Sequence, residues 1–224
     1  MNKPASAPYE VWFTADLHLK HTQILHYQKN RVVRMGLADE FDIKAHDNFV
    51  VEMWRRIVKP GDHVYVLSDV VKAPKERARV ILNDLKSTGC KIHLIAGNHD
   101  ENIRNLTELF ESIDDIKIAD FRCRAFPFLE HDLKVVMCHY PLVSWPFKHN
   151  GSLMLFGHIH NNSPWINEGT EGELRLNVGL DAPMADYGLI NLRTIYAWWK
   201  AQIGQMSPAD YIDAATAANP RFVR

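Results

Sequence analysis

The chain has 224 residues, of which 46% are hydrophobic and 24% are charged, and its formal net charge is −1 at pH 7. This is ordinary globular composition, with enough apolar residues to build a sizeable core. The balanced charge argues against the basic surface of a protein that binds long nucleic acids, although it leaves a small nucleotide as a possible substrate.

We predict a single domain over residues 1–224, with a core over about 9–195 and a C-terminal helical extension or tail over 196–224. Residues 207–224 are alanine-rich and follow a helix-start signal. Three widely spaced cysteines fit a reducing compartment. The opening residues lack the apolar stretch of a signal peptide, and no run approaches the ~18 apolar residues of a membrane span. We therefore predict a cytoplasmic protein with no membrane partner, and we leave its oligomeric state open.

In chain order, six short stretches rich in Val, Ile, Phe and Tyr are expected to be strands. Their apolar runs are nearly continuous, which is typical of strands that are buried on both faces. The six stretches are residues 9–18, 63–71, 91–100, 133–142, 152–160 and 174–181.

Between these strands, apolar residues that repeat about every 3.6 positions predict helices over 42–59 and 74–87, and a weaker one over 102–111. Residues 31–41 and 161–172 have no clear period and are expected to be loops. The first half of the chain alternates strands with helices, which indicates an α/β fold with parallel pairing, and the second half is richer in consecutive strands.

Polar side chains follow five consecutive apolar stretches, at the carboxyl ends where α/β sheets bind ligands. The residues are Asp16, His18, Asp69, Asn98, His139, His158 and His160. Two pairs, Asp16 with His18 and His158 with His160, are two residues apart, and at strand spacing such side chains point the same way. The sixth stretch ends in Asp181.

Each motif alone has a simpler interpretation, such as a polar turn, a helix cap or a structural histidine. Together they supply seven ligands, which is more than one ion needs but suits two ions that share a bridging carboxylate. Mixed Asp, Asn and His ligands favour Mn²⁺, Fe²⁺, Ni²⁺ or Zn²⁺ over Mg²⁺ or Ca²⁺. We therefore predict two divalent metal ions, with Mn²⁺ as the first choice.

The motif order Asp-x-His, Asp, Gly-Asn-His-Asp, His and Gly-His-x-His, from about Val11 to Asp181, resembles the calcineurin-like metallophosphoesterases. The surrounding segments KPGDHVYVLSD, HYPL and NVGLD are similar to the small phage and bacterial branch. The Asp-Arg-Gly extension of the Ser/Thr protein phosphatases is replaced by Val71-Lys72-Ala73. The resemblance implies a four-layer α-β-β-α sandwich of two mixed β-sheets flanked by helices.

The resemblance also implies roles for these residues. The first ion would be held by Asp16, His18 and His160, and the second by Asn98, His139 and His158, with Asp69 bridging the two. His99 would be the catalytic histidine and Asp100 its hydrogen-bond partner. Asn98, His99 and His21 would contact the substrate.

This arrangement suits hydrolysis of a phosphoric ester. Two ions ~3.5–4 Å apart clamp the attacking and leaving oxygens, and a hydroxide that bridges them is a nucleophile at neutral pH. His99 is expected to protonate the leaving alkoxide, a contribution of about 10²–10⁴-fold. We predict a phosphodiesterase or phosphatase with a small phosphoester or nucleotide-like substrate.

Several points stay open in the sequence. Ser68 and Lys20 stand where the family and the branch usually have glycine. Arg31 and Arg34 either bind phosphate or are solvated surface charges, and Trp145 with Phe147 either stack on a base or cover the core. The alternatives to a hydrolase of small substrates are a non-catalytic binding scaffold, which would be expected to lose ligands, and a nuclease that acts on short oligonucleotides.

Overall fold

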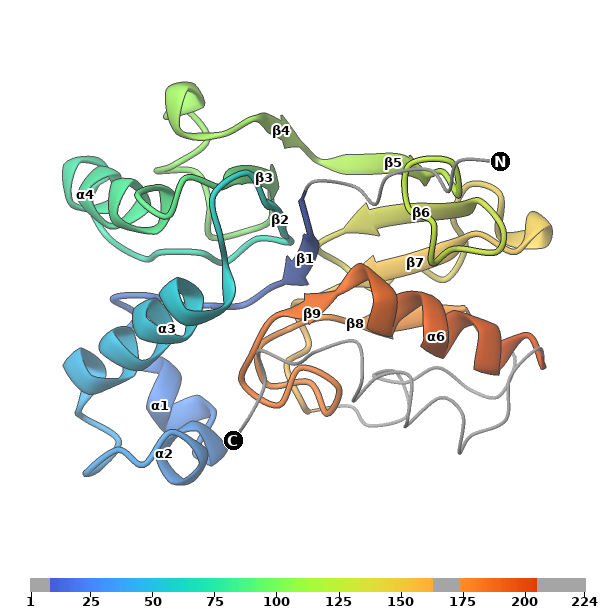
Figure 1. Ribbon diagram of the computed structural model, residues 1–224. Coiled ribbons are helices and arrows are strands. Elements are labelled where there is room, and N and C mark those ends of the chain that lie inside the picture. The colour runs from blue at the N-terminus through green and yellow to red at the C-terminus, as the bar shows by residue number, and fades with distance from the viewer. Residues whose placement is uncertain (1–8, 163–173, 205–224) are drawn as a thin grey trace.

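The computed structural model describes residues 9–162 and 174–204, and two β-sheets dominate these ranges (Figure 1). The first sheet has the strand order β4-β3-β2-β1-β9 and the second has the order β5-β6-β7-β8. The strands are β1 Val11–Thr14, β2 His63–Val66, β3 Lys91–Ile95, β4 Ser112–Asp114, β5 Ile116–Phe121, β6 Leu133–Cys138, β7 Leu153–Phe156, β8 Arg175–Asn177 and β9 Ile190–Asn191.

Both sheets are mixed. Strands β1 to β4 pair in parallel and β9 pairs antiparallel with β1, while β6, β7 and β8 pair in parallel and β5 runs antiparallel to β6. Parallel neighbours need long crossovers, which the helices α3 Ile43–Ile57 and α4 Lys75–Lys86 provide between β1, β2 and β3. The predicted α/β fold of two mixed sheets with flanking helices is confirmed.

Alternate residues of the first sheet serve two different cores. On β2, Val64 and Val66 belong to the cluster that α3 and α4 cover, whereas Tyr65 belongs to the cluster between the sheets. This is the period of two that a strand buried on both faces requires. The inner cluster also takes Met137 and Leu155 from the second sheet. The two sheets therefore share one core.

The helices begin and end close to where the sequence predicts. The Asp42 carboxylate caps α3 by accepting a hydrogen bond from Ala45 N at 3.0 Å, and α4 starts directly after Pro74. The helix α6 Leu192–Gln202 starts after Asn191, overlaps the first part of the segment expected to be a helical extension or tail, and adds Trp198 to the inner core. The expected boundary at residue 195 falls inside this helix.

Two local predictions were wrong. The segment expected to be a loop over 31–41 begins inside a short helix, α2 Asn30–Arg34, which follows another, α1 Ile24–Tyr27. In place of a helix over 102–111 there are turns and a 3₁₀ helix, η1 Thr107–Leu109. The buried residues Ile103, Leu106 and Leu109 are three apart, which suits 3₁₀ turns better than an α-helix.

The strands β4 and β5 were missed because acidic residues interrupt their apolar pattern. β5 is an edge strand in which Ile116 and Ile118 are exposed. Of the loop expected over 161–172, residues 163–172 lie outside the described residues, as does the helix or tail expected over 207–224. Within the described ranges, no helix combines the length and the hydrophobicity needed to cross a membrane.

Candidate metal centre

The predicted ligands leave both sheets at the carboxyl ends of their strands. β1 and β2 of the first sheet lead to Asp16 and Asp69, and β6 and β7 of the second lead to His139 and His158. The backbone N–H of His158 donates to both carboxylate oxygens of Asp16, at 3.1 and 3.0 Å. The two sheets are therefore joined at the place where the predicted ligands gather.

Around His139 the candidate ligand atoms are close together. Its Nε2 atom lies 3.0 Å from Asn98 Oδ1, 3.2 Å from His158 Nδ1 and 3.7 Å from Asp69 Oδ2. The same Asp69 oxygen lies 3.5 Å from Nε2 of His18. Asp69 thus stands between His18 and His139, as a bridging ligand would.

The other group consists of Asp16, His18 and His160, whose ligand atoms all lie within 4.8 Å of one another. A second set with the same spacing comprises Asp16, Asp69 and His139. Asp16 belongs to both sets, and His139 contacts Asn98 and His158, so all seven side chains predicted as metal ligands meet in one cluster.

The backbone at these residues is left-handed, which is uncommon outside glycine. The φ angles are 58° at Asp16, 51° at His18, 52° at Asp69, 71° at His158 and 51° at His160. These residues follow the strands and are not part of them, so the reason given for the convergence of the i, i+2 pairs was wrong: alternate left-handed residues turn the side chains inward, and the strand pleat does not. Each left-handed residue costs of order 1–3 kcal/mol, and such outliers cluster at functional sites.

Two glycines let the segments approach this closely. A Cβ at Gly97 would lie 2.4 Å from Cδ2 of His139, and a Cβ at Gly157 would lie 2.8 Å from Oδ2 of Asp16. Neither position has room for a larger residue unless a candidate ligand moves.

Hydrogen bonds hold the imidazole rings with one nitrogen toward the cluster. Nδ1 of His139 contacts Leu67 O at 2.9 Å, and Nδ1 of His160 contacts Asp181 Oδ2 at 2.7 Å. Nε2 of His18 is buried and has no hydrogen-bond partner among the described residues. A buried nitrogen without a partner is costly, and a metal ion at this point would satisfy it. The residues therefore fit the divalent ions that the family implies.

Burial and hydrogen bonding set the ionisation of the cluster. Burial would lower the pKa of His160, but its hydrogen bond to Asp181 raises that pKa above the ordinary value. Burial raises the pKa of Asp16 to about 6 and lowers the pKa of His18 well below its ordinary value. Burial also lowers the pKa of His158. Neutral imidazoles keep the lone pair that binds a metal, and a nearby cation would favour the ionised form of Asp16.

The predicted catalytic residues lie at the edge of the cluster. His99 is half-buried, and its ring centroid lies 6.0 Å from that of His18. The Asp100 carboxylate is buried and accepts hydrogen bonds from Gly97 N at 3.1 Å and Val70 N at 3.4 Å. Among the described residues, the Asp100 carboxylate has no hydrogen bond to His99. Its hydrogen bonds instead hold the backbone of the loop at Gly97. The catalytic roles of both residues remain predictions.

His21 also lies at this edge. Its Nδ1 atom is 3.0 Å from Nδ1 of His18, and its Nε2 atom is 3.3 Å from Nζ of the exposed Lys72. Burial and the Lys72 charge lower the pKa of His21 to about 4. Tyr140 is 42% exposed, and its ring centroid lies 4.8 Å from that of His158. The Lys72 ammonium group and the Tyr140 ring thus adjoin the cluster of candidate metal ligands.

Both departures from the family pattern are accommodated. Ser68 adopts φ 73°, and its hydroxyl donates to Asp69 Oδ1 at 3.0 Å. Lys20 adopts φ 62°, and its ammonium group pairs with Asp47 at 2.8 Å. Trp145 is 5% exposed and packs in a core cluster on the second sheet, so it covers the core, whereas Phe147 is 48% exposed.

The sequence did not identify the partners of His160. Arg31 is fully buried and pairs with Asp181, and thus it is neither a surface charge nor a phosphate ligand. Arg34 is exposed and pairs with Asp186. The only hint of these partners in the sequence was Asp181, which ends the sixth apolar stretch and to which no role was assigned. Burial would raise its pKa, but Arg31 and His160 hold the pKa of Asp181 well below its ordinary value.

The family model for calcineurin-like phosphoesterases matches residues 9–162, which include all seven candidate metal ligands. The chain belongs to the calcineurin-like phosphoesterase family. Membership makes it, in general terms, a metal-dependent phosphoester hydrolase, and it confirms the resemblance found in the sequence.

Individual relatives are distant. Gene 66 protein of Mycobacterium phage D29 is 25% identical over 190 residues, which are 77% of this chain and 88% of the phage protein. The Aquifex aeolicus protein AQ665, of unknown function, has a TM-score of 0.58 at 20% identity, over 84% of this chain and 97% of its own, and this likeness concerns the fold alone. Nuclease MPE of Pseudomonas putida has a TM-score of 0.35 at 17% identity, over 67% of this chain and 61% of its own.

Proposed function

We propose that this calcineurin-like phosphoesterase uses two divalent metal ions to hydrolyse phosphodiester or phosphomonoester bonds in small, nucleotide-like substrates. The observation that carries the proposal is the convergence of seven metal-competent side chains from both sheets around the buried Nε2 of His18, a nitrogen that has no hydrogen bond to any described residue. A cluster of these side chains with a purely structural role would not need left-handed backbone at five of its residues.

The proposed ligand sets are Asp16, His18 and His160 for one ion and Asn98, His139 and His158 for the other, with Asp69 shared. When bound, two divalent ions supply positive charge at the phosphoryl oxygens and lower the pKa of water to roughly 7. Nitrogen and oxygen donors in one site suit Mn²⁺, and also Fe²⁺, Ni²⁺ or Zn²⁺.

Residues beside the ions would bind and orient the ester. His99 lies next to His18 and is proposed to donate a proton to the leaving oxygen. The Lys72 ammonium group, which Nε2 of His21 contacts at 3.3 Å, would bind a phosphoryl oxygen, and His21 would orient it. The exposed ring of Tyr140 offers a face on which a base or a phenyl group can stack.

The test uses metal-stripped protein, supplied in turn with Mn²⁺, Ni²⁺, Zn²⁺ or Mg²⁺. The substrates are bis(p-nitrophenyl) phosphate, p-nitrophenyl phosphate, 2′,3′-cyclic nucleotides and short oligonucleotides. We expect metal-dependent turnover, with the diester at least comparable to the monoester, and its loss in Asp69→Asn. Bound metal is measured in parallel by mass spectrometry, with two ions per chain expected.

Other results would favour the alternatives. Binding of two ions without turnover of any of these esters would indicate a binding scaffold. Turnover confined to short oligonucleotides would indicate a nuclease. Failure to bind metal at all would remove the proposed site.

A further inference from the structure

Arg31 of α2 is a buried arginine that the proposed chemistry does not use. Its side chain is fully buried, and its guanidinium makes five contacts. The partners are Asp181 Oδ1 at 2.8 Å, Asp181 Oδ2 at 2.6 Å, Asp16 O at 2.6 Å, Leu17 O at 3.2 Å and His46 Nε2 at 2.9 Å. A guanidinium has five N–H donors, so every donor has an acceptor.

These contacts fix the state of His46. Because Arg31 stays protonated and can only donate, Nε2 of His46 must accept, and its proton must then sit on Nδ1. That atom lies 3.1 Å from Asp47 Oδ1, which also accepts from Lys20 N at 3.1 Å. A buried polar network therefore runs from Asp181 through Arg31 and His46 to Asp47, in contact with the loop that follows the first metal motif.

Two branches of this network reach the first metal position. Through Asp181, Arg31 fixes the ring of His160, whose Nδ1 lies 2.7 Å from the carboxylate, so that Nε2 is left for the metal. Through the carbonyls of Asp16 and Leu17 it holds the left-handed segment that carries Asp16 and His18. No contact of this kind joins Arg31 to Asn98, His139 or His158 among the described residues.

A buried ion pair often contributes little stability in comparison with apolar residues of the same volume. Partners that orient a metal ligand have a different effect, because their loss typically lowers metal affinity 10–100-fold. We propose that Arg31 is a positioning residue: together with Asp181 it sets the affinity of the first metal position and leaves the second nearly unaffected. This inference rests on the proposed two-metal site.

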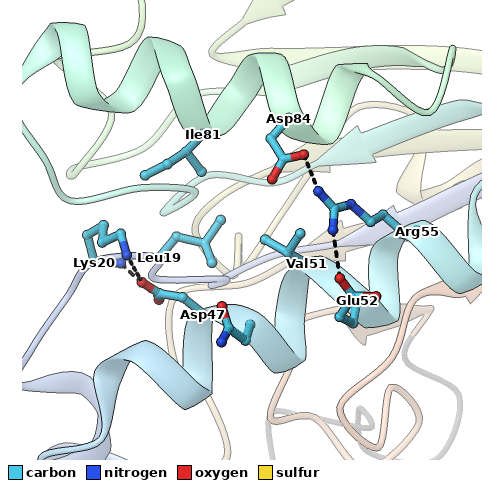
Figure 2. A pocket seen from close by; sticks show the side chains of 9 residues that line it. Leu19, Lys20, Asp47, Val51, Glu52, Arg55, Ile81 and Asp84 are labelled. Atoms are coloured by element: carbon cyan, nitrogen blue, oxygen red, sulfur yellow. Dashed lines mark hydrogen bonds and ion pairs between the residues drawn. The ribbon is translucent and has the colours of Figure 1, made fainter.

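The hydrogen-bonded network that starts at Asp181 ends at the surface. Lys20 and Asp47 line a cavity of about 300 Å³ between α3 and α4, and Figure 2 shows them paired on one side of it, with Arg55 between Glu52 and Asp84 on the other. The cavity's charged groups are thus paired with one another.

The test measures metal binding to metal-stripped protein by titration with Mn²⁺ and by mass spectrometry after gel filtration. The variants are Arg31→Met, Arg31→Lys and Asp181→Asn. Arg34→Met is the matched control, since it removes an arginine of the same helix whose ion pair with Asp186 is exposed. We expect two ions in the wild type and the control. We expect one tight ion and a second weakened 10–100-fold in Arg31→Met and Asp181→Asn, with part of the affinity restored by lysine.

A structural role alone would give a different pattern. It would lower the thermal unfolding temperature of the metal-free protein while both metal affinities stayed within twofold of the wild type, and that result would overturn the proposal. If Arg31→Met does not fold, Arg31→Lys and the isosteric Asp181→Asn decide the question by the same criterion. Equal weakening of both ions would also overturn it. A wild-type protein that binds two ions but hydrolyses no ester would contradict the proposed function and leave this measurement intact, whereas a wild type without bound ions would overturn both.

Discussion

Oδ1 of Asn98 lies 3.0 Å from Nε2 of His139, although the first residue follows β3 of one sheet and the second follows β6 of the other. An amide oxygen and an imidazole nitrogen at this distance are placed to bind the same metal ion at the edge where both sheets end. The contact therefore joins the sheets at the proposed second metal position.

Asn98→Ala removes the amide oxygen of this pair. We expect the second metal ion to bind more weakly and kcat to fall about 10²–10³-fold, because the amide also stabilises charge in the transition state. Metal stoichiometry and steady-state kinetics check this. The exposed Asn48→Ala on α3 is the control and should resemble the wild type. Unchanged stoichiometry and kcat in Asn98→Ala would remove Asn98 from the site.

Gly97→Ala introduces a Cβ that would lie 2.3 Å from Ser68 Oγ and 2.4 Å from His139 Cδ2. We expect a loss of roughly 1–3 kcal/mol in the free energy of unfolding, as for an overpacked core, together with weaker metal binding. Chemical denaturation and metal titration measure both. Gly61→Ala is the contrast, since its φ is 86° and no atom lies within 4 Å. It should lose about 1 kcal/mol but bind both ions normally. Normal metal binding by Gly97→Ala would contradict the need for close packing here.

His99→Ala should retain both metal ions, because His99 contacts the cluster only at its edge. We expect a rate loss of about 10²–10⁴-fold on esters with poor leaving groups and a much smaller loss on p-nitrophenyl esters. A series of aryl phosphodiesters with graded leaving-group pKa values measures this as a steeper dependence of rate on that pKa. Equal losses across the series would exclude proton donation by His99.

His93 should make stability depend on pH. It is 6% exposed, and burial, with His63 nearby, lowers its pKa from 6.5 to about 4. Between these values the unfolded chain binds the proton more readily, so the stabilisation is present above pH 6.5 and is lost as the pH falls. From pH 7.5 to 5, the metal-free wild type should lose about 2 kcal/mol more than His93→Gln.

Urea unfolding at both pH values measures this difference. His131→Gln, at an exposed position, should behave as the wild type does. The same pH dependence in His93→Gln and in the wild type would show that other groups cause the loss.

Most residues of the candidate metal centre were predictable because polar side chains are unusual directly after apolar strands. Asp16, Asn98 and His158 follow apolar strands, and a polar side chain directly after an apolar strand can be recognised from the sequence alone. The buried strands were predictable from their nearly continuous apolar runs, and α3 and α4 from apolar residues that repeat about every 3.6 positions. η1 was mistaken for an α-helix because a short run of residues three apart fits both.

The sequence by itself determined which chemical groups this protein collects and that they suit divalent ions. Only the tertiary structure decided how those groups are held, because the interactions are too distant in sequence to leave a local pattern. Arg31 and Asp181 are 150 positions apart. Whether an arginine is solvated or buried as a clamp depends on what the fold places around it. The left-handed backbone at Asp16 and His160 is likewise decided by tertiary packing, since it is uncommon even in Asp and His, which adopt it more often than most residues other than glycine.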